Sequence, residues 1–367
     1  MIYKMNLHRR LLDFLERRTL MSFSIRPEFP FLDIRNKRFL DVNMDATNQC
    51  NLRCKMCYLN VKRDQPTILM DTDTFSRIAN HIFPYAKSLT YSCDAEPFTN
   101  PHFIDFIRIG RSYNVPMTDL STNGHLLTPE ISEAIVREGI SVINVSIDAC
   151  TAKTYRIVRM NPNFGEVLEN VKMLVQAKKR ARSNRPNIYL AFVMMRRNIE
   201  ELPGFVKMAR GLGVQGVRGN HVVIFKGWGM RDEVLNKHKE LTNRMLSSAR
   251  KIAEAAGLQF CFPAPFTLGN KKIAPIHNPG SQCTMVHDTL FVAADGRVYP
   301  CPWLNDDPFW GRLGNARDQS LRDIWFGERF EKLRHNLKNN RLSETCFICP
   351  QMGGIGDVDD DRTFQEV

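Results

Sequence analysis

The chain has 367 residues, of which 43% are hydrophobic and 25% charged, and its formal net charge is +12 at pH 7. This balance is typical of a folded globular protein with one large domain or two unequal ones, and it excludes a disordered chain. No apolar run approaches the ~18 residues that span a bilayer, and no secretion signal is present. We therefore expect a cytoplasmic protein without a transmembrane segment.

The positive charge gathers partly in short clusters, which are Arg9-Arg10, Arg17-Arg18 and Lys178-Lys179-Arg180. Such clusters favour an anionic substrate, nucleic acid or acidic membrane surface as partner, although a solvated basic surface without a partner is the alternative. Residues 1–38 combine basic residues with leucines at helical spacing. This pattern predicts a basic helical extension, either packed on the protein's own core or lying on a membrane surface.

From residue 39 onward, apolar strand-like runs alternate with amphipathic helical runs, which is typical of βα units around a parallel sheet. Strands are predicted at Phe39–Ala46, Ser88–Cys93, Met117–Ser121, Ser141–Ile147, Ile188–Met194 and Val222–Phe225. Helices are predicted at Asp71–Phe83, Pro101–Tyr113, Pro129–Arg137, Phe164–Ala181, Ile199–Leu212 and Asn236–Ala256. About six βα units predict an α/β fold, an open partial (β/α)6 barrel over 39–260.

A proline-rich stretch from Pro263 to Pro279 follows the last predicted helix and predicts a domain boundary, with a second, small domain over 261–367. Within that domain, Asp295-Gly296 separates two short apolar runs. This dipeptide favours a tight hairpin between Leu290–Ala294 and Arg297–Tyr299.

Three cysteines, Cys50, Cys54 and Cys57, form a C-x3-C-x2-C run directly after the first predicted strand. In barrel folds the loops that follow the strands carry the chemistry, and thiols at this density indicate metal or cluster binding rather than disulfides in a cytosolic protein. Three thiolates on a [4Fe–4S] cube leave one iron open to a small ligand. A zinc site completed by a distant ligand, or thiols clustered by chance, is the alternative.

Four further cysteines lie in the C-terminal region, namely Cys283, Cys301, Cys346 and Cys349. The first two bracket the predicted hairpin, and the last two form a C-x2-C pair. Four thiols in this pattern suit either a zinc ion or a fully ligated [4Fe–4S] cluster. The remaining cysteines, Cys93, Cys150 and Cys261, are expected to be packed free thiols.

The segment from Cys50 to Tyr58 resembles the cluster loop of the radical S-adenosylmethionine (SAM) superfamily, and later segments agree with that family in order and spacing. Ser92 to Pro97 is similar to the family's Gly-Gly-Glu motif, although Asp94 and Ala95 replace its glycines. The resemblance implies that Glu96 holds the SAM amino group. It also implies SAM contacts from Ser121, Asn123, Ser146, Asp148 and Arg159.

The segment from Gly296 to Cys301 resembles the SPASM or Twitch extension of the same enzymes, which implies an auxiliary [4Fe–4S] cluster on Cys283, Cys301, Cys346 and Cys349. A full SPASM domain carries seven cysteines for two clusters. Because four are available here, the shorter one-cluster Twitch form is expected.

The implied activity is that of a radical SAM oxidoreductase, which reductively cleaves SAM to a 5′-deoxyadenosyl radical and abstracts hydrogen from its substrate. The implied electron source is an external donor such as flavodoxin or ferredoxin. A proton acceptor near the second domain is also expected, and the candidates in the sequence are His221, His287 and Asp288.

We expect oxidation or epimerisation of a small or carbohydrate- or polyol-like substrate, because about forty residues before the barrel are few for a leader-peptide-binding domain. A radical SAM maturase of a ribosomally made peptide is the alternative. A non-catalytic, zinc-stabilised nucleic-acid-binding protein is the alternative of another class.

Overall fold

The structure is a computed structural model, and it describes residues 38–57, 59, 65–161, 163–223, 230–268, 283–305, 307, 310–343 and 346. All but the last residue of the predicted N-terminal extension lies outside the described residues, and so does Cys349.

The described strands form one sheet in the order β10-β9-β8-β1-β2-β3-β4-β5-β6-β7. Their bounds are β1 Leu40–Met44, β2 Ala86–Tyr91, β3 Met117–Thr122, β4 Val142–Ser146, β5 Asn187–Met194, β6 Gly216–His221, β7 Gln259–Cys261, β8 Thr289–Val292, β9 Arg297–Tyr299 and β10 Gly314–Asn315. Strands β1 to β7 pair in parallel, so all their carboxyl ends lie at one edge of the sheet. The expected α/β fold with a parallel, barrel-like sheet is therefore confirmed.

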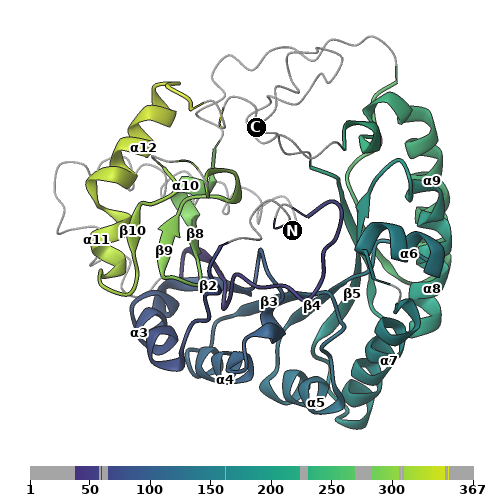
Figure 1. The fold of residues 1–367 in the computed structure, drawn as a ribbon, viewed down its shortest axis with the longest axis horizontal. Coiled ribbons are helices and arrows are strands. Elements are labelled where there is room, and N and C mark those ends of the chain that lie inside the picture. Colours follow the sequence, from purple (N-terminus) through teal and green to yellow (C-terminus); the bar gives the residue numbers. More distant parts are fainter. Residues whose placement is uncertain are drawn as a thin grey trace, which may run out of the picture.

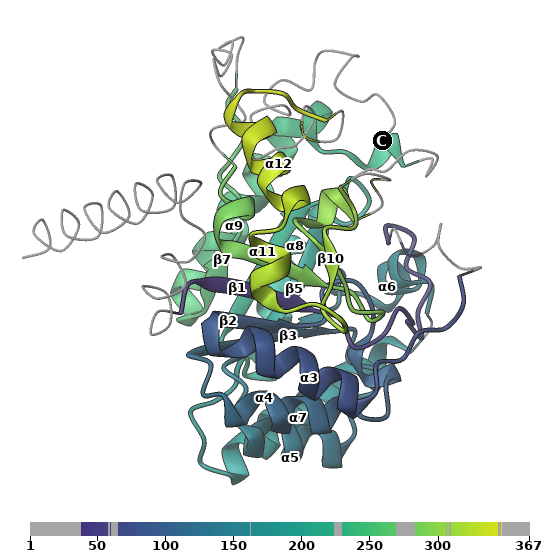
Figure 2. The same cartoon turned by 90° about the vertical axis from the view of Figure 1, so that its left-hand side faces the viewer.

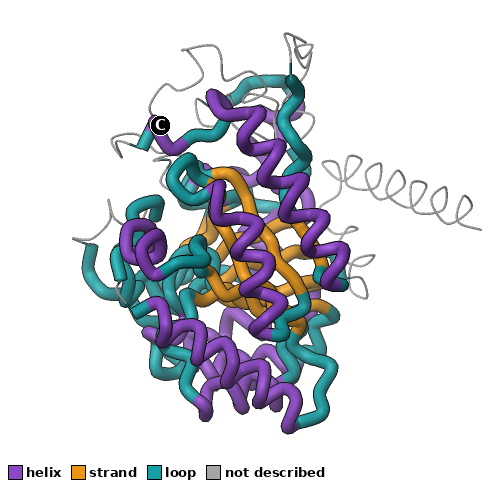
Figure 3. Tube along the Cα trace, turned by 90° about the vertical axis from the view of Figure 1, so that its right-hand side faces the viewer, coloured by secondary structure: helices purple, strands orange, loops and turns teal. Residues whose placement is uncertain are grey.

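The helices follow the strands and cover the outer side of a curved sheet (Figure 1). Figure 3, seen from the α8–α9 side, shows them in front of the strands. Their bounds are α3 Thr72–Ile82, α4 Phe103–Ser112, α5 Pro129–Glu138, α6 Ala152–Arg159, α7 Phe164–Arg180, α8 Leu202–Leu212, α9 Lys239–Ala256, α10 Met285–Asp288, α11 Leu321–Trp325 and α12 Glu328–Lys338. Within the described ranges, none of these helices is long and apolar enough to cross a membrane.

Helix α5 illustrates how the sequence sets these bounds. The Thr128 side chain accepts a hydrogen bond from the Ile131 backbone N–H at 3.2 Å, and Pro129 occupies the first helical turn. Gly139 ends the helix in the left-handed region, with φ at +75°.

The main core lies between the sheet and these helices. In β1, Leu40, Val42 and Met44 are buried, whereas the intervening Asp41 and Asn43 are partly exposed. This alternation places apolar side chains on the helix-covered face and polar ones on the concave face of the sheet.

The predicted strand Val222–Phe225 is wrong for Val222 and Val223, its two described residues, because the strand in this region is β6, Gly216–His221. The sequence pattern did not predict β6 because it contains Gly216 and Gly219, and glycine is rare inside strands. Both glycines are required by close neighbours: an added Cβ would lie 2.5 Å from the Gln259 carbonyl oxygen at the first and 2.3 Å from the Phe192 carbonyl oxygen at the second.

The predicted C-terminal hairpin is confirmed, with β8 and β9 antiparallel and Gly296 at φ +79° in the turn. The hairpin also continues the barrel sheet, because β8 pairs in parallel with β1 from Asp41–Thr289 to Met44–Val292. Helices α11 and α12 lie at this end of the sheet (Figures 1 and 2). The division into domains at residue 261 stays a prediction.

Candidate active site

The three-cysteine loop follows β1 at the carboxyl edge of the parallel sheet. Cys54 is buried, whereas Cys50 and Cys57 are partly buried. The loop is held to the end of α6 by a backbone hydrogen bond of 3.0 Å from the Lys55 N–H to the Val158 carbonyl. Helix α6, which carries this contact, was not predicted from the sequence.

Hydrogen-bond donors contact all three sulfurs, and the Cys57 thiol receives one from the Leu59 backbone. The Cys50 Sγ accepts from the Leu52 backbone N–H at 3.4 Å and from the Asn123 Nδ2 at 3.8 Å. The Cys54 Sγ accepts from Nη1 of Arg159 at 3.4 Å. Donors of this kind stabilise negatively charged sulfur, which is the form that ligates iron.

Burial raises the pKa of Cys50 and raises the pKa of Cys57 to about 12, so both thiols favour their neutral form in the protein alone. Iron binding would reverse this preference, because metal ligation deprotonates thiols. The thiol donors and their N–H partners thus fit a [4Fe–4S] cube with three protein ligands. In the described part of the chain, no three Cys, His, Asp or Glu side chains are gathered tightly enough to hold a single metal ion.

Glu96 connects the loop after β2 to the end of β3. Its carboxylate accepts hydrogen bonds from the Thr122 hydroxyl at 2.7 Å and from the Asn123 backbone N–H at 2.6 Å. Burial raises the pKa of Glu96 to about 7, although the two hydrogen bonds oppose this shift. The predicted SAM ligand is therefore a buried carboxyl. Asn123 connects it to the Cys50 sulfur, because its backbone N–H binds Glu96 and its side chain contacts Cys50.

The loss of the motif's two glycines does not strain this loop. Asp94 and Ala95 do not adopt positive φ; the left-handed conformation falls on Ser92, with φ at +69°. Ser92 is held there by its backbone N–H, which donates to the Met44 carbonyl at 2.8 Å, and by its hydroxyl, which donates to the Ala95 carbonyl at 2.7 Å.

Asp148 and Arg159 form a buried ion pair, with 2.6 Å between Oδ2 and Nη2. The second carboxylate oxygen of Asp148 accepts from the Val193 backbone N–H at 2.6 Å. Burial alone would lower the pKa of Arg159, but Asp148 and the Cys54 sulfur raise it above its usual value. The buried Nε of Arg159 has no hydrogen-bond partner among the described residues, so it keeps an unused donor.

The predicted contacts Ser121 and Ser146 lie near the carboxyl ends of β3 and β4 and are partly exposed. Beside them is a polar network that sequence reasoning missed, formed by Asp119, Asn144 and Arg218 across three strands. Nδ2 of Asn144 lies 3.0 Å from both carboxylate oxygens of Asp119, and its Oδ1 accepts from Nη1 of Arg218 at 2.8 Å. Since 47% of the Arg218 side chain is exposed, the guanidinium remains accessible on this face.

The structure separates the three predicted proton acceptors. His221 ends β6 at the same edge as the cysteine loop, packs its ring 4.8 Å from that of Phe266, and has a pKa lowered by burial. His287 and Asp288 precede β8, which is parallel to β1, so they lie at the opposite edge. There Asp288 pairs with Lys87 at 3.5 Å on the surface, which speaks against a catalytic role.

The expectation of packed free thiols is wrong for two of the three remaining cysteines. Cys93 and Cys261 are exposed, and only Cys150 is partly buried. Cys261 alternates with the core-packed Phe260 in β7 and so faces away from the helices. The Cys93 Sγ lies 3.3 Å from Oδ1 of Asn43 in the neighbouring strand.

Cys283, Cys301 and Cys346 are each partly buried against the main core, and their predicted partner Cys349 lies outside the described residues. The four-cysteine ligand set therefore stays a prediction.

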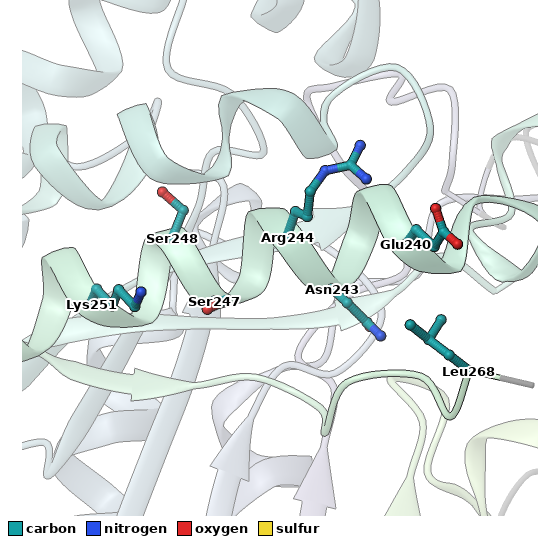
Figure 4. Close-up of a pocket in the computed structure, with 7 residues that line it drawn as sticks. All are labelled: Glu240, Asn243, Arg244, Ser247, Ser248, Lys251 and Leu268. Atoms are coloured by element: carbon teal, nitrogen blue, oxygen red, sulfur yellow. The ribbon is translucent and has the colours of Figure 1, made fainter.

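A surface groove of about 590 Å³ runs along α9 and contains none of the predicted site residues (Figure 4). The Asn243 side chain closes it by pairing with both backbone groups of Phe266 at 2.8 Å. Its lining residues are Glu240, Asn243, Arg244, Ser247, Ser248, Lys251 and Leu268.

Comparison with known families gives two matches. Residues 44–209 match the radical SAM superfamily, and residues 283–350 match the iron–sulfur cluster-binding domain SPASM.

Three curated relatives cover most of the chain. A tungsten-containing aldehyde ferredoxin oxidoreductase cofactor-modifying protein of Pyrococcus furiosus is 26% identical over 319 residues, covering 83% of this chain and 86% of the relative. An AdoMet-dependent heme synthase of Methanosarcina barkeri is 26% identical with the same coverage. A PqqA peptide cyclase of Gluconobacter oxydans is 24% identical, covering 77% of this chain and 75% of the relative.

Solved structures share the fold. SuiB of Streptococcus suis bound to S-adenosylmethionine has a TM-score of 0.66 at 14% identity, covering 83% of this chain and 70% of that one. An anSMEcpe structure with bound AdoMet and the Cp18Cys peptide has a TM-score of 0.61 at 15% identity, covering 85% and 87%. These likenesses show the fold.

Proposed function

Because the chain belongs to the radical SAM superfamily and carries a C-terminal SPASM domain, we propose that it is a hydrogen-abstracting oxidoreductase that modifies a peptide. These two domains imply SAM and two [4Fe–4S] clusters as cofactors. The expected carbohydrate- or polyol-like substrate finds no support among the relatives named above, whereas a peptide does. The matches to a radical SAM domain and to an iron–sulfur cluster-binding domain speak against the alternative of a zinc-stabilised nucleic-acid-binding protein.

The observation that carries the peptide proposal is the similarity to a PqqA peptide cyclase over 77% of the chain. Peptide-bound structures of the same fold support it, since SuiB was also solved with its precursor peptide SuiA. The polar concave face agrees with such a substrate, because the accessible Arg218 guanidinium and the partly exposed Asp119 carboxylate offer a donor and an acceptor to backbone amides.

In this proposal, Cys50, Cys54 and Cys57 hold the SAM-binding cluster. When bound, the cluster and SAM supply a 5′-deoxyadenosyl radical. Arg159 keeps positive charge beside Cys54, and its guanidinium, with one unused donor at Nε, would hold the carboxylate of SAM. Glu96 accepts a hydrogen bond from the SAM ammonium group, whose positive charge lowers the pKa that burial raises.

The proposal also needs an electron donor and a proton acceptor. An external reductant such as flavodoxin or ferredoxin delivers the electron, and the net charge of +12 favours an acidic carrier. His221 remains the proton-acceptor candidate, because it lies at the edge of the sheet that carries the cysteine loop.

The test is anaerobic reconstitution followed by incubation with dithionite, SAM and the short peptides encoded beside its gene. We expect about eight irons per chain, 5′-deoxyadenosine, and a changed peptide mass. With deuterated peptide, deuterium should appear in the 5′-deoxyadenosine. Peptides that remain unmodified while 5′-deoxyadenosine forms freely would contradict the peptide substrate.

A second candidate is modification of a cofactor, which the Pyrococcus and Methanosarcina relatives favour by name. The same assay with heme precursors and with the cofactor of a tungsten enzyme distinguishes it, because only the true substrate should accelerate 5′-deoxyadenosine formation.

A further inference from the structure

Asp94, which stands where the family's motif has a glycine, joins the SAM-binding loop to the C-terminal segment. Its Oδ2 accepts a hydrogen bond from Nδ2 of Asn305 at 3.2 Å and lies 3.5 Å from the Tyr299 hydroxyl. Tyr299 is 1% exposed and Asn305 is 9% exposed, whereas Asp94 is partly exposed, so the contact is partly shielded from water. These two residues flank the predicted cluster ligand Cys301 in the sequence.

The other side of the Asp94 loop is equally constrained. The backbone N–H groups of Cys93 and Asp94 both donate to Oδ1 of the buried Asp45, at 2.7 and 3.1 Å. The backbone N–H of Asp45 donates to the Val292 carbonyl of β8 at 2.9 Å. The loop after β2 is therefore fixed to the C-terminal hairpin at two points, one through Asp45 and one through the Asp94 side chain.

Two residues beyond Asp94, the loop reaches the SAM site. Glu96 accepts from the Asn123 backbone N–H at 2.6 Å, and the Asn123 side chain reaches the Cys50 sulfur at 3.8 Å. A continuous path of one short loop and its hydrogen bonds thus joins the Cys301 segment to the first cluster loop.

We propose that Asp94 is a positioning residue that holds the SAM-binding loop and the Cys301 segment in one arrangement, so that SAM binds fully only when the auxiliary-cluster segment is docked. This role rests on the proposed function. Because hydrogen bonds to a charged group are stronger than those between neutral groups, the carboxylate suits this junction better than the glycine it replaces. Its negative charge also acts on any cluster held by Cys301.

The test uses the reconstituted full chain and the variants Asp94→Ala, Asp94→Asn and Asn305→Ala, with Asp318→Asn as control. Asp318 is an exposed carboxylate of the same segment, outside the junction. We expect Asp94→Ala and Asn305→Ala each to weaken SAM binding about tenfold, and the double variant no more than either, since they break one contact. Asp94→Asn should weaken SAM binding less, because the amide oxygen still accepts.

A second readout separates positioning from general stability. Redox titration followed by electron paramagnetic resonance should show a more positive midpoint potential of the auxiliary cluster in both Asp94 variants, because a negative charge is removed. Asp318→Asn should leave affinity and potential unchanged. Wild-type SAM affinity and potential in Asp94→Ala would overturn the proposal, as would additive losses in the double variant. If wild-type protein itself fails to cleave SAM, the proposed function fails instead.

Discussion

Cys50, Cys54 and Cys57 lie within eight consecutive residues of one loop, whereas the C-terminal set runs from Cys283 to Cys349. The first set is positioned by the end of one strand and by N–H donors from neighbouring loops. The second depends on a hairpin, on α10 and on a distant C-x2-C pair. A local ligand set can keep its geometry when a remote part of the chain is disturbed, but a dispersed set cannot. The two regions should therefore fail differently when altered.

The largest expected effect is at the local set. Replacing Cys50, Cys54 and Cys57 with Ala should remove about four irons and abolish 5′-deoxyadenosine formation, because no thiol remains to hold the cube. Iron analysis and chromatography of the nucleoside measure this. Cys261→Ala is the control, because this exposed thiol lies outside both predicted sets. Retained SAM cleavage in the triple variant would refute the assignment of the first cluster.

Loss of the dispersed set should be more selective. Cys346→Ala with Cys349→Ala should eliminate product while leaving abortive SAM cleavage partly intact, since the predicted SAM contacts all lie between Glu96 and Arg159. Assaying product and 5′-deoxyadenosine separately tests this difference. Product at wild-type rate would mean that the auxiliary cluster has no function in turnover.

The next effect compares a buried with an exposed ion pair. Arg159→Gln should lower the free energy of unfolding by about 3–5 kcal/mol, because Asp148 would stay buried without its counter-charge. Arg180→Gln should cost less than about 0.5 kcal/mol, since Arg180 and Glu133 are each 59% exposed. Urea unfolding of the cluster-free protein measures both. Equal losses would show that the Asp148–Arg159 pair is not shielded as the structure indicates.

The smallest effect concerns Glu96. Burial raises the pKa of this carboxyl from its usual value of 4.5 to about 7. Between these pH values the unfolded chain loses the proton while the folded one keeps it. The free energy of unfolding should therefore fall by up to about 3 kcal/mol as pH rises through this window. Glu96→Gln should remove that decrease, whereas Glu169→Gln on the surface should not.

Glu96→Gln, which should make the protein more stable at high pH, should at the same time weaken its binding of SAM. Glu96→Gln should weaken SAM binding by about 1.5–3 kcal/mol at pH 8, because a charge-assisted hydrogen bond to the ammonium is lost. Isothermal titration with cluster-loaded protein measures this. Unchanged affinity would mean that Glu96 only supports the end of β3.

Sequence patterning alone identified the cysteine loop, five of the seven parallel strands β1 to β7, and the C-terminal hairpin. These features succeed because their signals are local: cysteine spacing, apolar runs and a turn dipeptide lie within a few residues of the structure they specify. Strand β6 was not predicted because Gly216 and Gly219 have low β propensity. The structure requires both glycines, because Gln259 and Phe192 pack closely against them.

Only the tertiary structure decided which distant residues meet. The Asp119–Asn144–Arg218 network, the Asp94–Asn305 contact and the Asp148–Arg159 ion pair each join residues on different elements. It likewise placed His287 and Asp288 at the edge opposite the cysteine loop, because β8 runs parallel to β1. The order and direction of the strands determine which distant residues come into contact. Both depend on packing across the whole sheet rather than on residues nearby in the chain.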